Sequence, residues 1–211
     1  MIKAAIIDFD GTLVADDMLS VVCGIVGKED ASRQLARAFI EGRRPGLSPL
    51  IERINFLKGV TISQLEEKIN EDPHLMPGAR ELFSYFNEHH IVSIVSSGNI
   101  LPVLTCYQKM LGITYAVGSK PQMQGDTIFG ISENNFSHRD FKITESKEIL
   151  NKLSISQKET LAIGDSPADK MIFDYAEVTI AIHPIHGIEK AADYVITDDL
   201  QKVIPIIERY L

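Results

Sequence analysis

The sequence predicts an α/β protein: a Rossmann-like parallel sheet core with an inserted all-helical cap and a small β-hairpin. Short apolar runs alternate with helical patterns along most of the chain, which is typical of parallel strands joined by crossover helices. The stretch between the first two runs contains helical patterns and no strand pattern. We therefore expect a core formed by residues 1–14 and 77–211, and a helical cap formed by residues 15–76.

The predicted strands are nearly continuous apolar runs, as expected of parallel strands that are buried on both faces. These runs cover residues 2–7, 91–95, 160–163, 178–182 and 193–196. None of them approaches the roughly 18–20 apolar residues that a membrane-spanning helix needs.

Helices are expected between these strands. One helix should begin at Pro77, because proline is favoured in the first turn. Another should follow Asn99 and end at Gly112. The last helix should be capped by Asp198, and Pro205 should kink or break it.

Two features distinguish the cap and the hairpin. Within residues 15–76, the segment from Ser63 to Glu66 is a capping-box pattern that indicates the start of a helix. Residues 120–129 are expected to form the hairpin, with Gly125 in the turn.

Composition limits the class of protein. The 211 residues can hold one sizeable core and a small accessory unit. The net charge of −8 argues against nucleic-acid binding, which needs a basic surface. Cys23 and Cys106 are expected to be buried free thiols, and Met1 leads directly into the first strand, leaving no signal peptide. We expect a cytoplasmic monomer or homodimer with no membrane or nucleic-acid partner.

Asp8 and Asp10 follow the first strand directly, in the motif Asp8-Phe9-Asp10-Gly11-Thr12. Ligands of open parallel sheets bind beyond the carboxyl ends of the strands. Two carboxylates so close together repel, which raises a pKa or recruits a cation. The alternative for this motif taken alone is a surface turn in which one aspartate caps the next helix.

Three further groups complete a pattern in chain order. They are Ser96-Ser97-Gly98 after the second strand, Lys147 at the start of a helical stretch, and Gly164-Asp165 through Asp169 after a third strand. This set resembles the haloacid dehalogenase-like phosphohydrolases, whose pattern is DxDGT, then Ser or Thr, then Lys, then GDxxxD. Within that superfamily the chain looks most like the phosphoserine phosphatases.

The resemblance implies a role for each acidic residue in a Mg²⁺-dependent phosphatase. Asp8 would be the nucleophile that forms an aspartyl-phosphate, and Asp10 would be the general acid and base. The Mg²⁺ ligands would be the Asp8 carboxylate, the Asp10 backbone carbonyl and Asp165. Asp169 would orient Asp165 or a metal-bound water.

The resemblance also implies the groups that contact the phosphate. Lys147 would neutralise the phosphate charge and shield Asp8, although Lys142 is a close competitor. Ser96 would donate its hydroxyl, and the backbone that follows, including Gly98, would bind the phosphate oxygens. Ser97 remains the rival for the hydroxyl role.

The expected partner is a small phosphorylated metabolite, with O-phosphoserine the leading candidate. In phosphoserine phosphatases an acid binds the substrate ammonium and an arginine binds its carboxylate; Asp17 and Arg53 fall at these positions. Three departures are the short side chain of Asp17, Gly46 in place of a large aromatic, and Ala168 in place of asparagine. They leave open phosphoethanolamine, phosphocholine, or a sugar or keto-acid phosphate.

Other functions are also compatible with the fold. Dehalogenases lack the second aspartate, so Asp10 speaks against dehalogenation, and phosphonate cleavage would need a Schiff-base lysine in the cap. A catalytically idle protein that only binds a metabolite would also keep the fold, because a fold alone does not establish a function.

Overall fold

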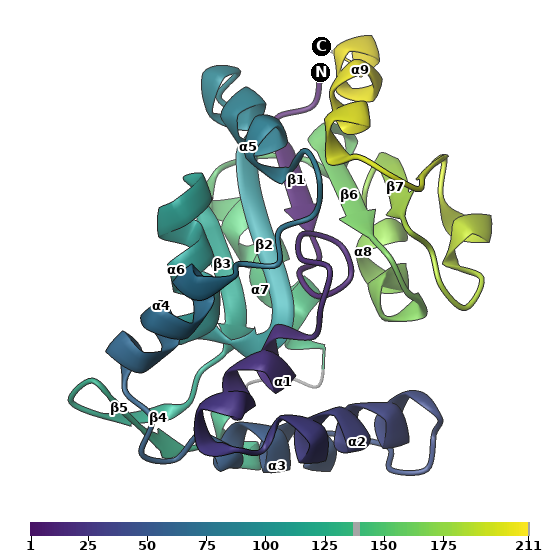
Figure 1. Cartoon of the computed structure of the whole chain (residues 1–211). Helices are drawn as coiled ribbons and strands as arrows, with labels where there is room; N and C mark the ends of the chain where they lie inside the picture. Colours follow the sequence, from purple (N-terminus) through teal and green to yellow (C-terminus); the bar gives the residue numbers. More distant parts are fainter. Residues whose placement is uncertain (137–139, 211) are drawn as a thin grey trace.

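A six-stranded parallel sheet forms the centre of the computed structural model, which describes residues 1–136 and 140–210 (Figure 1). The strand order is β3-β2-β1-β6-β7-β8. The strands are β1 (Ala4–Ile7), β2 (Val92–Ile100), β3 (Tyr115–Ser119), β6 (Thr160–Gly164), β7 (Val178–Ile182) and β8 (Tyr194–Ile196). The predicted parallel sheet is confirmed. The sequence prediction missed β3, an edge strand that is only partly apolar and contains Gly118.

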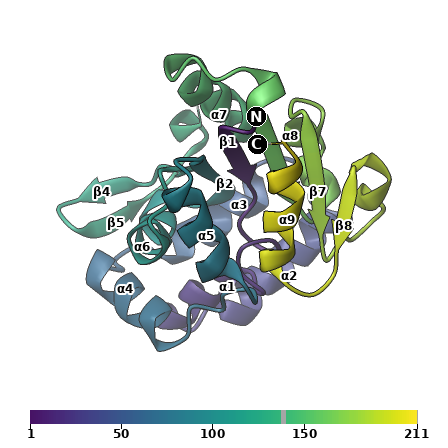
Figure 2. The same ribbon diagram turned by 90° about the horizontal axis from the view of Figure 1, so that it is seen from above.

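Helices cover both faces of the sheet (Figure 2). One face packs against α5 (Ala79–Glu88), α6 (Leu101–Leu111) and α9 (Ile204–Ile207), and the other against α7 (Phe141–Lys152) and α8 (Lys170–Phe173). Successive strand residues point to opposite faces, so Ile7 belongs to the first core and Ile6 to the second. This alternation explains why the strands are apolar throughout.

Short 3-10 helices complete the described part of the chain. They are η1 (Gly24–Val26), η2 (Glu133–Asn135), η3 (Gln157–Glu159), η4 (Pro167–Asp169), η5 (Ile188–Ala191), η6 (Leu200–Val203) and η7 (Glu208–Tyr210).

The predicted helix ends are correct in part. Helix α6 ends at Gly112 as predicted, whereas α5 begins at Ala79 because Gly78 precedes it with φ 76°. The last helix is broken as predicted, with Pro205 in the first turn of α9 after η6. Its cap is Asp199 and not Asp198, since the Asp199 side chain accepts from the N–H of Gln201.

The named elements between β1 and α5 are all helices, as predicted for the cap: α1 (Met18–Cys23), η1, α2 (Glu29–Ile40), α3 (Ser48–Phe56) and α4 (Ile62–Glu71). The capping box of α4 pairs Thr61 with Gln64, two residues before the predicted pattern. The two connections to the core run side by side, since the N–H of Ala15 donates to the carbonyl of His74 at 2.8 Å. None of the helices in the described ranges has the length and apolar character to cross a bilayer.

The predicted hairpin is present as β4 (Gln122–Gln124) and β5 (Thr127–Gly130), and it is hydrogen-bonded to the cap. The N–H of Gly59 donates to the carbonyl of Ile128 at 2.9 Å, and the N–H of Ile128 donates to the carbonyl of Val60 at 2.9 Å. Asn55 also exchanges two hydrogen bonds of 3.0 Å with the backbone of Ile131. These bonds attach the hairpin, which belongs to the predicted core range, to the cap. The domain boundary at residue 76 stays a prediction.

Gly130 tests how closely the hairpin and the cap must approach. It has φ 137°, and a Cβ there would lie 2.6 Å from Lys58 Cε and 2.7 Å from Asn55 Oδ1. We expect Gly130→Ala to lower the free energy of unfolding by about 2–4 kcal/mol, from backbone strain and lost hydrogen bonds. The control Gly125→Ala, with no atom within 4 Å, should lose only about 1 kcal/mol. Urea unfolding measures both, and equal losses would contradict a required close approach.

Candidate active site at the carboxyl edge of the sheet

The acidic residues of the site follow two adjacent strands. The strand order reverses direction at β1, which lies between β2 and β6. Asp8 follows β1 and Asp165 follows β6, and the N–H of Asp8 donates to the carbonyl of Ile163 at 2.9 Å. Open α/β sheets bind ligands beyond the carboxyl ends of the strands at such a reversal. The register therefore places both carboxylates where a ligand is expected.

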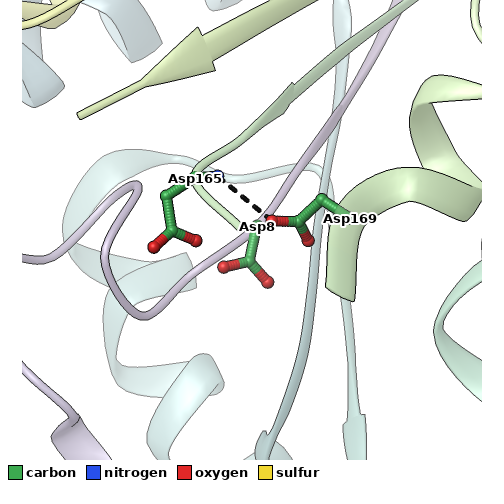
Figure 3. Close-up of side chains that lie close together, drawn as sticks. All are labelled: Asp8, Asp165 and Asp169. Carbon is green, nitrogen blue, oxygen red and sulfur yellow. Dashed lines mark hydrogen bonds between the residues drawn. The ribbon is translucent and has the colours of Figure 1, made fainter. Parts of the chain in front are cut away.

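Three carboxylates meet at this point (Figure 3). One oxygen from each of Asp8, Asp165 and Asp169 lies within 4.8 Å of the others, and the residues are only 7%, 8% and 1% exposed. Asp169 Oδ2 accepts from the backbone N–H groups of Asp165 at 3.1 Å and Ser166 at 3.2 Å. Asp169 therefore fixes the loop that carries Asp165.

Gly11 allows the loop after β1 to lie directly against Asp165. It has φ 87°, and a Cβ at this position would lie 2.4 Å from Asp165 Oδ2. Only glycine combines that backbone conformation with so close an approach. The glycine of the first motif is thus explained by the position of the second acidic loop.

Burial of so many acids makes their charged forms unfavourable. Burial raises the pKa of Asp8 to about 6, and the nearby Asp169 adds to the shift. Burial raises the pKa of Asp165 to about 8, with Asp8 and Asp169 as further causes. A bound cation would relieve this repulsion, and a cluster of hard oxygen ligands is compatible with a divalent metal.

Lys142, and not Lys147, is the lysine at this cluster. Its Nζ lies 2.6 Å from Asp8 Oδ1 and 3.4 Å from Asp169 Oδ1. The Nζ of Lys147 lies 4.7 Å from the centre of the Tyr175 ring. The expectation that Lys147 shields Asp8 is therefore corrected.

Helix geometry explains this correction. Helix α7 begins with Phe141, so Lys142 lies in the first turn. Residues five apart differ by roughly 140° around a helix and about 7.5 Å along it. Lys147 therefore points in another direction and lies farther along α7. The sequence prediction placed Lys147 at the start of the helical stretch, whereas Lys142 lies there in the structure.

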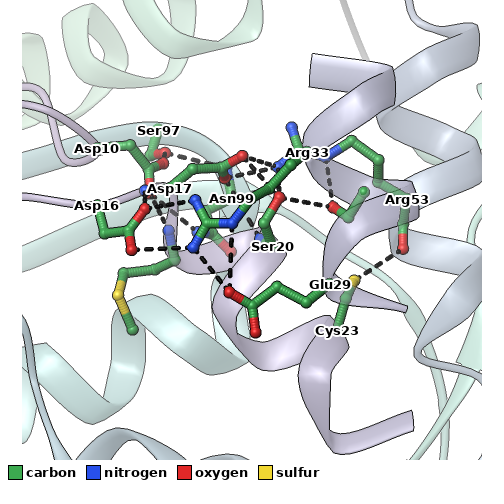
Figure 4. Close-up of polar contacts among 12 residues, drawn as sticks. Asp10, Asp16, Asp17, Ser20, Cys23, Glu29, Arg33, Arg53, Ser97 and Asn99 are labelled. Atoms are coloured by element: carbon green, nitrogen blue, oxygen red, sulfur yellow. Dashed lines mark hydrogen bonds and ion pairs between the residues drawn. The ribbon is translucent and has the colours of Figure 1, made fainter. Parts of the chain in front are cut away.

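Asp10, two residues after Asp8, lies at the junction with the cap (Figure 4). Its Oδ1 accepts from the backbone N–H of Met18, the first residue of α1, at 2.8 Å, and its Oδ2 accepts from Ser97 Oγ at 3.2 Å. Burial raises the pKa of Asp10 to about 7, and the negative charges of Asp17 and Asp8 add to the shift. Asp10 can therefore hold a proton near neutral pH.

Ser96 and Ser97, the two consecutive serines of β2, face different neighbours. Ser96 Oγ is buried and donates to the backbone carbonyl of Lys142 at 3.2 Å, so it supports that lysine. Ser97 donates to Asp10, and the Leu50 side chain of the cap lies over Gly98, with Cδ2 3.7 Å from the position of a Cβ. The role of Ser96 as the hydroxyl donor to a phosphate, with Ser97 as its rival, stays a prediction.

Asp17 and Arg53, the predicted substrate residues, lie together in the cap. Arg53 Nη2 donates to Asp17 Oδ1 at 2.5 Å, and Arg53 Nε donates to Ser32 Oγ at 2.8 Å. Ser20 Oγ also donates to Asp17 Oδ2 at 2.8 Å. The side chains of Asp17 and Arg53 are 29% and 12% exposed, so both are partly buried beside Asp10.

Several of these polar residues were missed by sequence reasoning. Ser20 and Ser32 contact Arg53, and Arg33 makes two bonds of 2.7 and 2.9 Å to Asp16 in the linker that precedes α1. Arg33 also holds the pKa of Asp16 below its usual value. Ser20 lies on α1, whereas Ser32 and Arg33 lie on α2, and no motif connects them with Arg53 in the sequence.

Comparisons with known proteins agree on the family. A family model described as haloacid dehalogenase-like hydrolase matches residues 5–172. A phosphoserine phosphatase of Campylobacter jejuni is 24% identical over 98% of this chain and 100% of its own length. One of Methanocaldococcus jannaschii is 25% identical over 98% of each chain.

Solved structures share the fold. A phospho-aspartyl intermediate analogue of phosphoserine phosphatase has a TM-score of 0.80 at 23% identity, covering 97% of this chain and 98% of that chain. A HAD family hydrolase of Salmonella enterica has a TM-score of 0.88 at 16% identity, covering 100% of this chain and 72% of that chain.

Lys142 and Lys147 form a matched pair for testing the charge balance. We expect Lys142→Met to lower the free energy of unfolding by about 2–4 kcal/mol at pH 8, because it leaves buried carboxylates without their counter-charge. Lys147→Met should cost at most about 1 kcal/mol, the usual size of an exposed cation–π contact. Urea unfolding at pH 8 and pH 5 measures both. The Lys142 effect should shrink at pH 5, where Asp8 takes up a proton; equal effects of the two variants would contradict the assignment.

Proposed function

This chain belongs to the haloacid dehalogenase-like hydrolase family, and from that premise we propose that it hydrolyses small phosphomonoesters through a phosphorylated aspartate. The observation that carries the proposal is the placement of Asp8, which lies against Lys142 on one side and against Asp165 and Asp169 on the other. Asp10 is two residues away with a raised pKa. A nucleophile, a cationic group and a proton donor therefore occur together.

Mg²⁺ is the proposed cofactor. Asp8, Asp165 and the backbone carbonyl of Asp10 would hold it, and Asp169 would keep the Asp165 loop in place through its two backbone hydrogen bonds. When bound, the ion would neutralise charge on the acids and on the phosphate oxygens.

The chain's own residues account for the two chemical steps. The Asp8 carboxylate attacks phosphorus, a new O–P bond forms, and the P–O bond to the alcohol breaks while Asp10 gives that oxygen a proton. In the second step Asp10 takes a proton from water, whose oxygen attacks phosphorus and releases phosphate from Asp8. Lys142 neutralises charge on the phosphate throughout.

Phosphoserine is the leading substrate. An arginine can bind a carboxylate through two parallel hydrogen bonds. In the proposal, Arg53 binds the carboxylate of phosphoserine and Asp17 binds its ammonium group. The support is the position of both side chains beside Asp10, together with the phosphoserine phosphatases among the relatives. The short Asp17 and the absence of a side chain at Gly46 keep phosphoethanolamine, phosphocholine, and sugar or keto-acid phosphates in the test.

A panel of these compounds with added Mg²⁺ tests the proposal. We expect phosphate release from phosphoserine, and a loss of at least about 10³-fold in kcat for Asp8→Asn, which removes the nucleophile. Arg53→Met should raise KM for phosphoserine by about 10- to 100-fold and change KM for phosphoethanolamine little, since the latter has no carboxylate. Phosphate release from none of the compounds would refute the function. Equal effects of Arg53→Met on both substrates would refute the role of Arg53.

The raised pKa values predict how Mg²⁺ binding depends on pH. The pKa values of Asp165 and Asp8 are about 8 and about 6, above the usual 3.8. Between pH 3.8 and these raised pKa values, the folded protein therefore binds more protons than the unfolded chain. Stability of the metal-free protein should therefore fall as pH rises toward 8. Mg²⁺ must displace these protons, so its affinity should rise over the same range.

Melting temperatures with and without Mg²⁺ at pH 6 and pH 8 check this expectation. The increase caused by Mg²⁺ should be larger at pH 8, and Asp165→Asn should largely abolish it. An increase that is the same at both pH values would count against binding at these acids.

A further inference from the structure

Asn99, near the end of β2, has its side chain against Asp10 (Figure 4). It is 2% exposed, and its Nδ2 lies 3.4 Å from Asp10 Oδ1. The same oxygen accepts from the N–H of Met18 at 2.8 Å. A buried amide beside a reacting carboxyl group is a candidate for controlling its orientation.

The orientation of the Asn99 amide is fixed by its other contacts. Its Oδ1 accepts from the backbone N–H of Ile100 at 2.8 Å. Turning the amide over would place two N–H donors against each other there, so the nitrogen must face Asp10. The backbone N–H of Asn99 also donates to Ser97 Oγ at 3.0 Å, and that hydroxyl contacts Asp10 Oδ2. Asn99 therefore contacts the Asp10 carboxyl group directly and also holds the Ser97 hydroxyl that contacts its other oxygen.

The two oxygens of Asp10 are consequently different. Oδ1 faces two N–H groups, and neither of these can accept a proton. Oδ2 faces the Ser97 hydroxyl, which can donate or accept. The hydrogen-bonding pattern thus leaves Oδ2 as the oxygen that can carry a proton without losing an N–H partner.

We propose that Asn99 is a positioning residue that holds the Asp10 carboxyl group in one orientation, so that Oδ2 exchanges the proton with the leaving group. This inference rests on the proposed function. In the first step the O–H bond at Oδ2 breaks and the proton goes to the alcohol oxygen, as that oxygen takes the electron pair of the breaking P–O bond. Oδ1 keeps its donors from Asn99 and Met18 throughout.

The proposal predicts that loss of Asn99 matters only when the leaving group needs a proton. An alkyl phosphate leaves as a strongly basic alkoxide unless it is protonated, whereas p-nitrophenolate leaves readily without a proton. The two substrates to compare are p-nitrophenyl phosphate and phosphoserine, or the best alkyl substrate of the panel. The quantity to measure is kcat/KM, which ends at the first irreversible step and so excludes hydrolysis of the phosphorylated enzyme.

We expect Asn99→Ala to lower kcat/KM for the alkyl substrate by about 10- to 100-fold, part of what a general acid contributes, and for p-nitrophenyl phosphate by less than about 3-fold. The loss should lie in kcat and not in KM. Asn99→Asp keeps the side-chain size but replaces the donor with an acceptor, so it should lose at least as much on the alkyl substrate. Asn151→Ala, at an exposed position on α7, is the matched control and should change neither value.

The outcomes separate this proposal from the function on which it rests. If the wild-type protein hydrolyses neither compound, the proposed function fails and the role of Asn99 falls with it. If the wild-type protein hydrolyses both, equal losses on both substrates or no loss on either would overturn the role of Asn99 alone. Thermal melting of both variants identifies a folding defect. If Asn99→Ala does not fold, the kcat/KM values of Asn99→Asp on the two substrates test the proposal instead.

Discussion

The charge balance among Asp8, Asp165, Asp169 and Lys142 is the interaction on which the rest of the structure depends. Three nearly buried carboxylates lie within 4.8 Å of one another, and one ammonium group contacts two of them. Such a group is costly to bury unless the charges are paired or neutralised. The reversal of strand order at β1, the glycine at position 11 and the first turn of α7 all serve this one arrangement.

The cap is attached to the same arrangement through Asp10. The N–H of Met18, where the first cap helix begins, donates to the Asp10 carboxylate. Asp17 precedes it and pairs with Arg53 from α3. The position of the cap and the orientation of the proposed proton donor are therefore fixed by adjacent residues. The cap is also attached to the hairpin, through backbone hydrogen bonds between the hairpin and residues 59–62.

Much of the fold and part of the site could be predicted from the sequence. The continuous apolar strands identified the parallel sheet, and the residues that follow them identified Asp8, Asp10 and Asp165, because the carboxyl ends of parallel strands share one edge. Helix ends were less predictable, since Gly78 and Asp199 act through local backbone contacts. Ser20 and Ser32 could not be identified, because their partner Arg53 is distant in the chain. Asn99 could not be identified either, because its contact with Asp10 depends on the orientation of both side chains.

The sequence by itself determined the fold class, the helical insertion and the acidic motifs, since each of these is written in local periodicity and in the residues that end a strand. Only the tertiary structure decided that Lys142 and not Lys147 contacts Asp8, and that Asp17 pairs with Arg53. The physical reason is that both lysines suit the same helix equally well. Their difference lies in the direction of the side chain and the distance from the sheet edge, which exist only after the helix has packed.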